Sequence, residues 1–412
     1  SEEIWISFEN NDFNDQFNLD RDGTAGMYID TFDISETETF TQEINLNIER
    51  DAMSLVFGLF YMDDETSRHT HFDNPQPILG FLTPSMFDFK HDKMDTESEA
   101  YFADGTFDLS DVTRLSLGVR RTTDEFTSKQ DNFISVLVPA PLIALQTCDR
   151  EVVTEYSSTT SRAVIQHDLT TDSNVYVSLS EGYKAGGYAT YECTEPYDPE
   201  EVTSLELGFK GSIGEGTSVN ASLFRYDYTD FQVLQVVGIQ TVTKNAGDAT
   251  VNGLEIEALS NVNDSLSINY GLTLLDATYG EFLNINGIQP ELGDQQLDGN
   301  YLTNAPKVSI NLGLNYTSAM SSGASLTYRA NAAYKSRIYF SEFNEYSQDA
   351  YTILDLNLIW ESADETMRSR FFVKNATDED YIAGYLSSAT GGGRFGQWGY
   401  PRTVGIEIQR NF

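Results

Sequence analysis

Apolar and polar residues alternate strictly in many segments of this chain. In segment 307–316, every second residue is apolar (Val308, Ile310, Leu312, Leu314 and Tyr316), and the residues between them are polar or glycine. Segments 265–276 and 351–360 repeat the pattern, and so does the end of the chain, which closes on the aromatic Phe412. Successive side chains of a β-strand point to opposite faces, so the alternation predicts strands with one apolar face rather than amphipathic helices.

The alternation predicts about sixteen strands, with centres near residues 5, 45, 57, 102, 118, 163, 178, 206, 222, 254, 270, 312, 329, 355, 371 and 406. Short joins, such as 50–52, 109–111, 170–173, 214–216, 261–264, 318–323 and 363–366, alternate with long polar stretches. The long stretches are 10–39, 66–95, 125–156, 185–199, 280–304, 337–349 and 376–398. A meander with short turns at one rim and long loops at the other is typical of outer-membrane β-barrels.

A soluble all-β protein is the alternative that these strands leave open. Strand length argues against it, because the alternating segments run for about ten residues, enough to cross a bilayer at a tilt. Their Ser, Asn, Gly and Glu faces suit a wet lumen better than a sandwich core. The sequence contains no run of about 18 apolar residues, so it predicts no transmembrane helix. No signal peptide is visible at the start. The net charge of −39 argues against a nucleic-acid partner.

Several segments together resemble the barrel of the TonB-dependent outer-membrane receptors. They are NVYVSLSEGYKAGGY (174–188), EVTSLELGFKG (201–211), NAGDATVNGLEIEA (245–258), LTNAPKVSINLGLNY (302–316), FFVKNATDEDYIAGY (371–385) and GYPRTVGIEIQRNF (399–412). The resemblance implies a transmembrane antiparallel barrel of about 22 strands with a plugged lumen. The chain shows no plug, no energy-coupling box and about six strands too few, so we expect residues 1–412 to be the C-terminal barrel part of a longer receptor. In outer-membrane barrels a C-terminal aromatic residue is the assembly signal, and we expect Phe412 to have this role.

The same resemblance implies energised uptake of a scarce, large nutrient across the outer membrane of a Gram-negative bacterium. An iron–siderophore complex is the expected ligand, and a TonB-type protein acting through the plug is the expected partner, beside the membrane lipid. Vitamin B12, haem, nickel complexes and oligosaccharides stay open as ligands. A passive porin and a structural or adhesive barrel are the rival functions. We expect neither a cofactor nor an enzymatic activity, because the usual hydrolase, metalloprotease and phosphate-binding motifs are missing.

Glu206 and Glu255 match family positions whose carboxylates face the lumen and pair with plug arginines. Both lie on the polar face of their segments by alternation. Buried carboxylates need partners, so the resemblance implies that these two contact the plug. The alternative is a pair of hydrated lumenal carboxylates.

Basic and aromatic residues in or beside the last two long stretches are candidates for binding an anionic or planar ligand. They are Lys335, Arg337, Tyr339, Phe340, Tyr385, Arg394, Phe395 and Trp398. Packing of loop against loop, or an aromatic girdle, is the alternative role.

Cysteines, histidines and acidic loops give weaker signals. Cys148 and Cys193 lie in consecutive long stretches and are expected to form a disulfide, with free thiols or zinc ligation as alternatives. His69, His71 and His91 share one long stretch and are weak candidates for a metal site, for which a solvated loop is the alternative. Asn18, Asp20 and Asp22 have the spacing of positions 1, 3 and 5 of an EF-hand loop, but position 12 is Ile29, which argues for an acidic surface loop.

Overall fold

The computed structural model describes residues 2–20, 30–74, 85–136, 143–188, 196–237, 240–286, 289–388 and 393–411. Sixteen strands form the main sheet: β1 (Glu2–Asp20), β2 (Asp30–Arg50), β3 (Met53–Asn74), β4 (Ser85–Ser110), β5 (Thr113–Val136), β6 (Ile143–Thr170), β7 (Ser173–Lys184), β8 (Glu200–Ser212), β9 (Thr217–Thr229), β12 (Ala249–Asn263), β13 (Leu266–Tyr279), β16 (Val308–Ala319), β17 (Ser325–Lys335), β20 (Tyr351–Glu361), β21 (Met367–Lys374) and β24 (Thr403–Arg410).

Four small hairpins stand apart from this sheet, within its long connections. They are β10 (Gln232–Val237) with β11 (Gln240–Asn245), β14 (Leu283–Ile285) with β15 (Asp294–Gln296), β18 (Ile338–Tyr339) with β19 (Ser347–Gln348), and β22 (Ile382–Ser388) with β23 (Gly393–Trp398). The 3₁₀ helix η1 (Pro290–Leu292) lies between β14 and β15. Among the described residues, no helix is long and apolar enough to cross a membrane.

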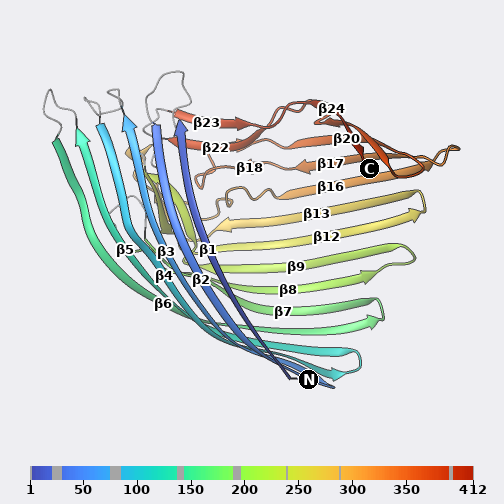
Figure 1. Cartoon of the computed structure of the whole chain (residues 1–412), viewed down its shortest axis with the longest axis horizontal. Helices are drawn as coiled ribbons and strands as arrows, with labels where there is room; N and C mark the ends of the chain where they lie inside the picture. The colour runs from blue at the N-terminus through green and yellow to red at the C-terminus, as the bar shows by residue number, and fades with distance from the viewer. Residues whose placement is uncertain are drawn as a thin grey trace.

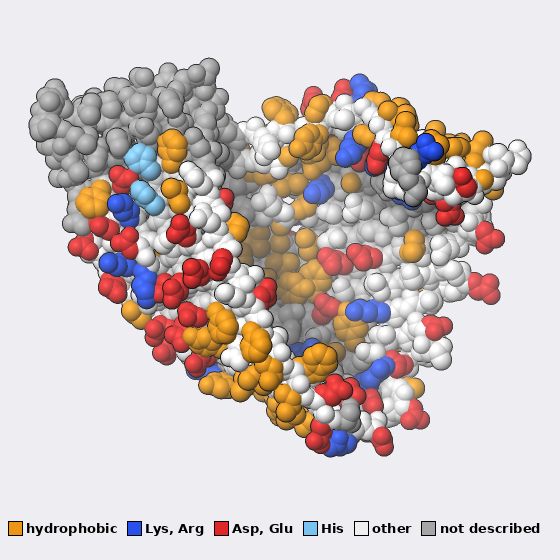
Figure 2. Space-filling view, viewed as in Figure 1, with side chains coloured by type: hydrophobic (Ala, Val, Ile, Leu, Met, Phe, Trp, Pro, Cys, Tyr) orange, Lys and Arg blue, Asp and Glu red, His pale blue; other side chains and the backbone are white. Residues whose placement is uncertain are grey.

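Every strand of the main sheet pairs antiparallel with its neighbour, from β1 at one edge to β24 at the other. The prediction of about sixteen strands is confirmed, and each predicted centre falls inside one of them. The sheet curves around a central space (Figure 1), and the space-filling view shows a deep hollow between the N-terminal and C-terminal strands (Figure 2).

The short joins are tight turns at one rim, on the right of Figure 1. In the turn between β8 and β9, Gly214 and Gly216 have φ angles of 65° and 82°. L-residues with a Cβ rarely adopt this left-handed region, so glycine suits a turn this short. The long connections, with their small hairpins, lie at the opposite rim.

The first six strands are longer than the sequence predicts. They span 19 to 28 residues, so much of the stretches 10–39, 66–95 and 125–156, which we expected to be loops, is strand. The reason is that pairing continues beyond the apolar segment: Thr39 still faces Asp64 and Glu97 faces Glu125 in register. Thr-rich segments keep a β preference without an apolar face. Strands β1 to β6 therefore extend further from the rim of short turns than the other strands do.

A belt of exposed apolar side chains crosses the outer face of the sheet. Leu205 is 51% exposed, Leu312 46% and Ile406 70%, while the residues between them on each strand face the other side. Other members are Ile4, Ile6, Leu46, Phe57, Leu59, Leu117, Val119, Ile165, Val177, Leu179, Leu207, Leu223, Leu274, Leu314, Leu356, Phe371 and Ile408. Leaving so much apolar surface in water is unfavourable. The belt therefore marks the face that a bilayer would cover.

Candidate functional site

Glu206 and Glu255 lie on the inner face of the sheet, on strands separated by β9. Leu205 and Leu207 flank Glu206 on the outer face, where both are about half exposed. Glu206 pairs in register with Phe224, and Glu255 with Ser222 two residues away on the same strand. The two carboxylates are therefore near neighbours on one patch of the inner wall.

An aromatic surface supports Glu206. The hydroxyl of Tyr176 donates to Oε1 of Glu206 at 2.5 Å, and Nζ of Lys210 lies 5.3 Å from the centre of the Tyr176 ring. The ring packs over Gly208, where a Cβ would sit 2.2 Å from Cζ. Among the described residues, Glu255 has no such hydrogen bond. The carboxylate of Glu206 is therefore held by Tyr176, whereas that of Glu255 can accept hydrogen bonds from another partner.

Three predicted ligand candidates pack between outer loops. Phe340 stacks on Tyr385 with ring centres 6.0 Å apart, and Tyr385 stacks on Tyr346 at 4.9 Å. Tyr339 stacks on Tyr301 at 5.8 Å. These contacts join the β18–β19 connection to β22 and to the connection after β13. They correspond to the alternative role considered for these residues, the packing of loop against loop.

The remaining candidates do not join this stack. Arg337 forms an ion pair with Asp349 at 2.8 Å, and both side chains are mostly exposed. Lys335 is exposed at the end of β17, and Trp398 is 68% exposed. Arg394 and Phe395 lie in β23, but their side chains are outside the described ones.

Sequence reasoning missed a network that locks the outer loops together. Nδ2 of Asn284 donates to Glu342 at 3.3 Å, and Nδ2 of Asn286 donates to Glu345 at 3.1 Å. The Asn300 side chain donates to the Glu342 carbonyl at 2.9 Å. A small core of Ala246, Tyr279, Phe282 and Leu297 packs against Phe343, the residue after Glu342. The frequent Asn residues of stretch 280–304 were the available signal, but their partners are more than 40 residues away in sequence.

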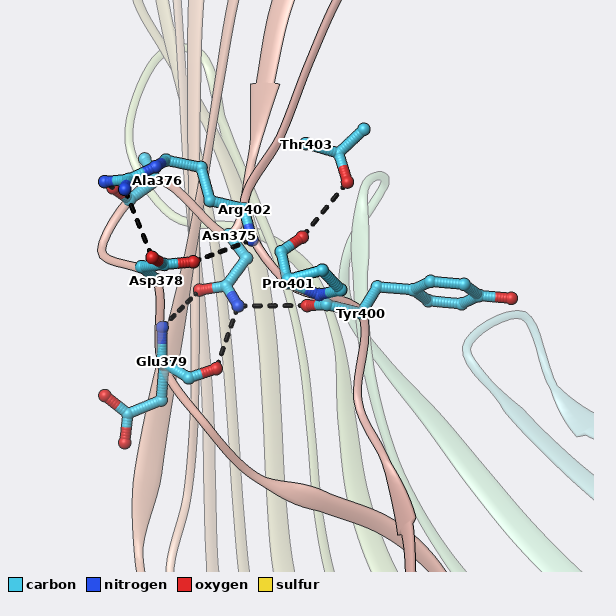
Figure 3. Close-up of polar contacts among 8 residues, drawn as sticks. All are labelled: Asn375, Ala376, Asp378, Glu379, Tyr400, Pro401, Arg402 and Thr403. Atoms are coloured by element: carbon cyan, nitrogen blue, oxygen red, sulfur yellow. Dashed lines mark hydrogen bonds and ion pairs between the residues drawn. The ribbon is translucent and has the colours of Figure 1, made fainter.

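A second polar cluster, the rim clasp of Asn375, Asp378 and Arg402, fixes the start of the last strand (Figure 3). Asn375 is 3% exposed; its Nδ2 donates to the carbonyls of Glu379 at 2.9 Å and Tyr400 at 3.0 Å, and its Oδ1 accepts from the Glu379 amide at 2.9 Å. Arg402 donates from its backbone and its guanidinium to Asp378, at 3.0 and 3.1 Å. The clasp ties the two ends of the connection that carries β22 and β23.

The connection between β7 and β8 folds onto the inner wall. Gly187 and Tyr197 bridge its two described arms, and the Tyr156 hydroxyl donates to the Tyr197 carbonyl at 3.0 Å. A cavity of about 210 Å³ lies there, lined by Tyr188 of this connection and by residues of β3 to β5 that include His91. The described ends of this stretch, which we expected to be a long polar loop, therefore lie against the inner wall.

The histidines divide between the two faces of the wall. His69 and His71 both contact Oδ1 of Asp88, at 3.2 and 2.7 Å. His91 is buried on the opposite, inner face. The described residues contain no group of three or more His, Cys, Asp or Glu placed to hold a metal ion.

Four predicted site residues cannot be placed in full. The side chain of Asp20 and the whole of Asp22, Cys193 and Phe412 lie outside the described residues. Cys148 is 5% exposed on β6 and takes part in a disulfide. Its pairing with Cys193 stays a prediction.

Comparison with known proteins places this wall in a family. The family model described as "TonB dependent receptor-like, beta-barrel" matches residues 4–376. The pesticin receptor of Yersinia enterocolitica is 26% identical over 385 residues, covering 88% of this chain and 49% of the receptor. The ferric-pyoverdine 358 receptor of Pseudomonas putida is 23% identical over 327 residues, covering 76% of this chain and 35% of the receptor. The chain thus spans about half the length, or less, of these curated relatives.

Solved structures share the fold. The ferric yersiniabactin uptake receptor FyuA from Yersinia pestis has a TM-score of 0.78 at 19% identity, over 100% of this chain and 58% of that one. The siderophore receptor PiuA from Acinetobacter baumannii has a TM-score of 0.70 at 16% identity, over 98% of this chain and 61% of that one. With the match to the family model, these findings show that the chain belongs to the TonB-dependent receptor β-barrel family.

Proposed function

We propose that this chain is the barrel wall of an outer-membrane receptor that actively imports a large metal chelate, most specifically an iron–siderophore complex. The observation that carries the proposal is the match of this wall to two receptors whose names specify ferric siderophores, over 76% of the chain for the ferric-pyoverdine 358 receptor and 100% for the ferric yersiniabactin uptake receptor. The apolar belt around the outside supports the membrane location, because it gives bilayer hydrocarbon a continuous surface.

Active import through so wide a barrel requires a filled lumen, since an open barrel of this size conducts water and ions. We propose that a plug domain of the same receptor fills it and passes energy from a TonB-type protein. Glu206 and Glu255 are the wall residues that we assign to hold the plug, through charge-assisted hydrogen bonds from arginines. Tyr176 already orients the first of them.

Uptake of radioactive iron tests the transport function. Cells that depend on the intact receptor are supplied with ferric yersiniabactin or ferric pyoverdine, with and without a working TonB-type protein. We expect uptake of at least one chelate that stops when the coupling protein is deleted. Uptake that is independent of the coupling protein would establish a passive porin instead.

Single-channel conductance tests the assignment of the two glutamates. We expect Glu206→Ala and Glu255→Ala to increase the frequency of openings of the intact receptor in planar bilayers, because each change removes an anchor of the plug. Glu215→Ala is the matched control, with the same charge change in an exposed turn. Heat-modifiable migration confirms folding. Mutants as closed as the control would show that both carboxylates are ordinary parts of a wet wall.

A further inference from the structure

Arg120 lies on the inner face of β5, at the height of the outer apolar belt. Its neighbours Val119 and Arg121 face outward, and Val119 is 49% exposed within the belt. In register, Arg120 lies between Phe102 of β4 and Thr160 of β6. The guanidinium therefore faces the lumen.

Two phenyl rings and one hydroxyl hold this guanidinium. Its Cζ atom lies 5.4 Å from the ring centre of Phe60 and 5.4 Å from that of Phe102, and its Nε donates to Oγ1 of Thr122 at 3.1 Å. The Phe102 ring packs over Gly58, where a Cβ would meet Cζ at 2.0 Å. A bulkier residue at position 58 would displace the ring, so the glycine is part of the construction.

No carboxylate pairs with Arg120 among the residues that the structure describes, although the chain has 64 acidic residues and only 25 basic ones. Asp104, on the neighbouring strand, is already taken by both Nε and Nη2 of Arg162, at 2.7 and 2.8 Å. That ion pair passes over Gly118, where a Cβ would lie 2.4 Å from Oδ2 of Asp104. Ion pairs with Asp or Glu occupy many other arginines: Arg50, Arg68, Arg114, Arg225, Arg337, Arg370 and Arg402.

We propose that Arg120 is a carboxylate-binding site in the lumen. Aromatic faces attract the cation and fix its plane, while the four N–H groups of its two Nη atoms stay available for a bidentate contact. A planar fork of this kind matches a carboxylate. The inference rests on the proposed function, because the carboxylate comes either from the plug or from a carboxylate-bearing chelate in transit.

The test compares Arg120→Met with Arg121→Met in the intact receptor. Both changes remove one positive charge from adjacent positions, but Arg121 lies on the outer face, where it donates to Thr159 and Ser157. Conductance in planar bilayers and binding of ferric citrate are measured, with ferrioxamine, which has no carboxylate, as the comparison chelate. Heat-modifiable migration is checked for each variant.

More frequent openings in Arg120→Met alone would identify a plug carboxylate as the partner. A loss of ferric citrate affinity of about 10-fold or more, with ferrioxamine binding unchanged and the channel closed, would identify the chelate. Arg120→Lys should restore only part of either effect, since a lysine keeps the charge and loses the fork. If the wild-type receptor binds and transports a chelate but Arg120→Met and Arg121→Met behave alike, the inference about Arg120 is wrong. A wild-type receptor without energised uptake would instead refute the proposed function.

Discussion

Asn375 joins the two ends of the last long connection at the outer rim. Its buried side chain makes three hydrogen bonds to the backbone on both sides of the last long connection. Its own φ of 46° is one that asparagine tolerates better than most residues. The rim clasp therefore depends on this residue type in two independent ways.

Asn375→Ala should lower the free energy of unfolding by about 2–3 kcal/mol, because it leaves buried backbone groups without partners. The measurement is the urea midpoint of the folded, heat-modifiable form. Asn331→Ala, on the exposed inner face of β17, is the control and should change the midpoint little. Equal midpoints for the two variants would show that the clasp adds nothing to stability.

Glu342 makes the outer-loop network sensitive to pH. Burial raises the pKa of Glu342 above its ordinary value of 4.5. A backbone hydrogen bond acts against this increase, and the negative charge of Glu345 adds to it. For an acid with a raised pKa in the folded state, the stabilisation is complete below the ordinary value and is lost as the pH rises through the raised one. The loops should therefore open more easily at neutral pH than at acid pH.

Hydrogen exchange of residues 280–304 and 336–350 across this pH range measures the effect. Glu342→Gln keeps an oxygen for Asn284 but cannot ionise, so we expect it to remove the additional opening at neutral pH. The comparison of variant and wild type at each pH cancels the intrinsic pH dependence of exchange. If hydrogen exchange depends on pH in the same way in wild type and in Glu342→Gln, Glu342 is not the origin of the easier loop opening at neutral pH.

At the scale of elements, the sequence predicts what depends on local alternation. The sixteen strands and their short turns follow from residues such as Leu312 and Asn311, which mark opposite faces. The upper halves of β1 to β6 are missed because apolar residues such as Phe32 and Ile34 are scattered there among mostly polar ones, and pairing depends on a neighbour already in register. Pattern alone cannot distinguish such a hairpin from a polar loop.

The contacts of the candidate site are non-local, which is why sequence reasoning found residues but not their partners. Tyr385 was predicted as a ligand contact, and its stacking on Phe340 depends on two connections meeting above the wall. The setting of Arg120 depends on a register that places Phe102 beside it. Neither arrangement leaves a periodic trace in the sequence.

The inner connection between β7 and β8 supplies a prediction about covalent structure. Cys148 takes part in a disulfide, and we expect Cys193, the other cysteine of the chain, to be its partner, so that the bond holds this connection against β6. Titration of thiols in denatured, unreduced protein should find none, and loss of the bond should cost about 2–4 kcal/mol of stability. Two reactive thiols would refute the bond.

At the scale of the whole molecule, two surfaces with opposite chemistry define what the wall can do. The outer face carries the apolar belt, and the inner face carries Glu206, Glu255 and Arg120 among hydroxyl and amide groups. Acidic side chains gather on the N-terminal wall in Figure 2. A membrane around the belt, with water or protein inside the wall, would satisfy both surfaces.

Spin labels on Leu312→Cys and Asn311→Cys in the receptor reconstituted into liposomes test this arrangement most directly. The two positions are adjacent on β16, so only the face of the strand differs between them. Molecular oxygen partitions into bilayer hydrocarbon, and a water-soluble nickel chelate stays in the aqueous phase. The account predicts strong relaxation by oxygen and little by nickel at position 312, with less oxygen access at position 311. Nickel access at 312 combined with oxygen access at 311 would contradict it.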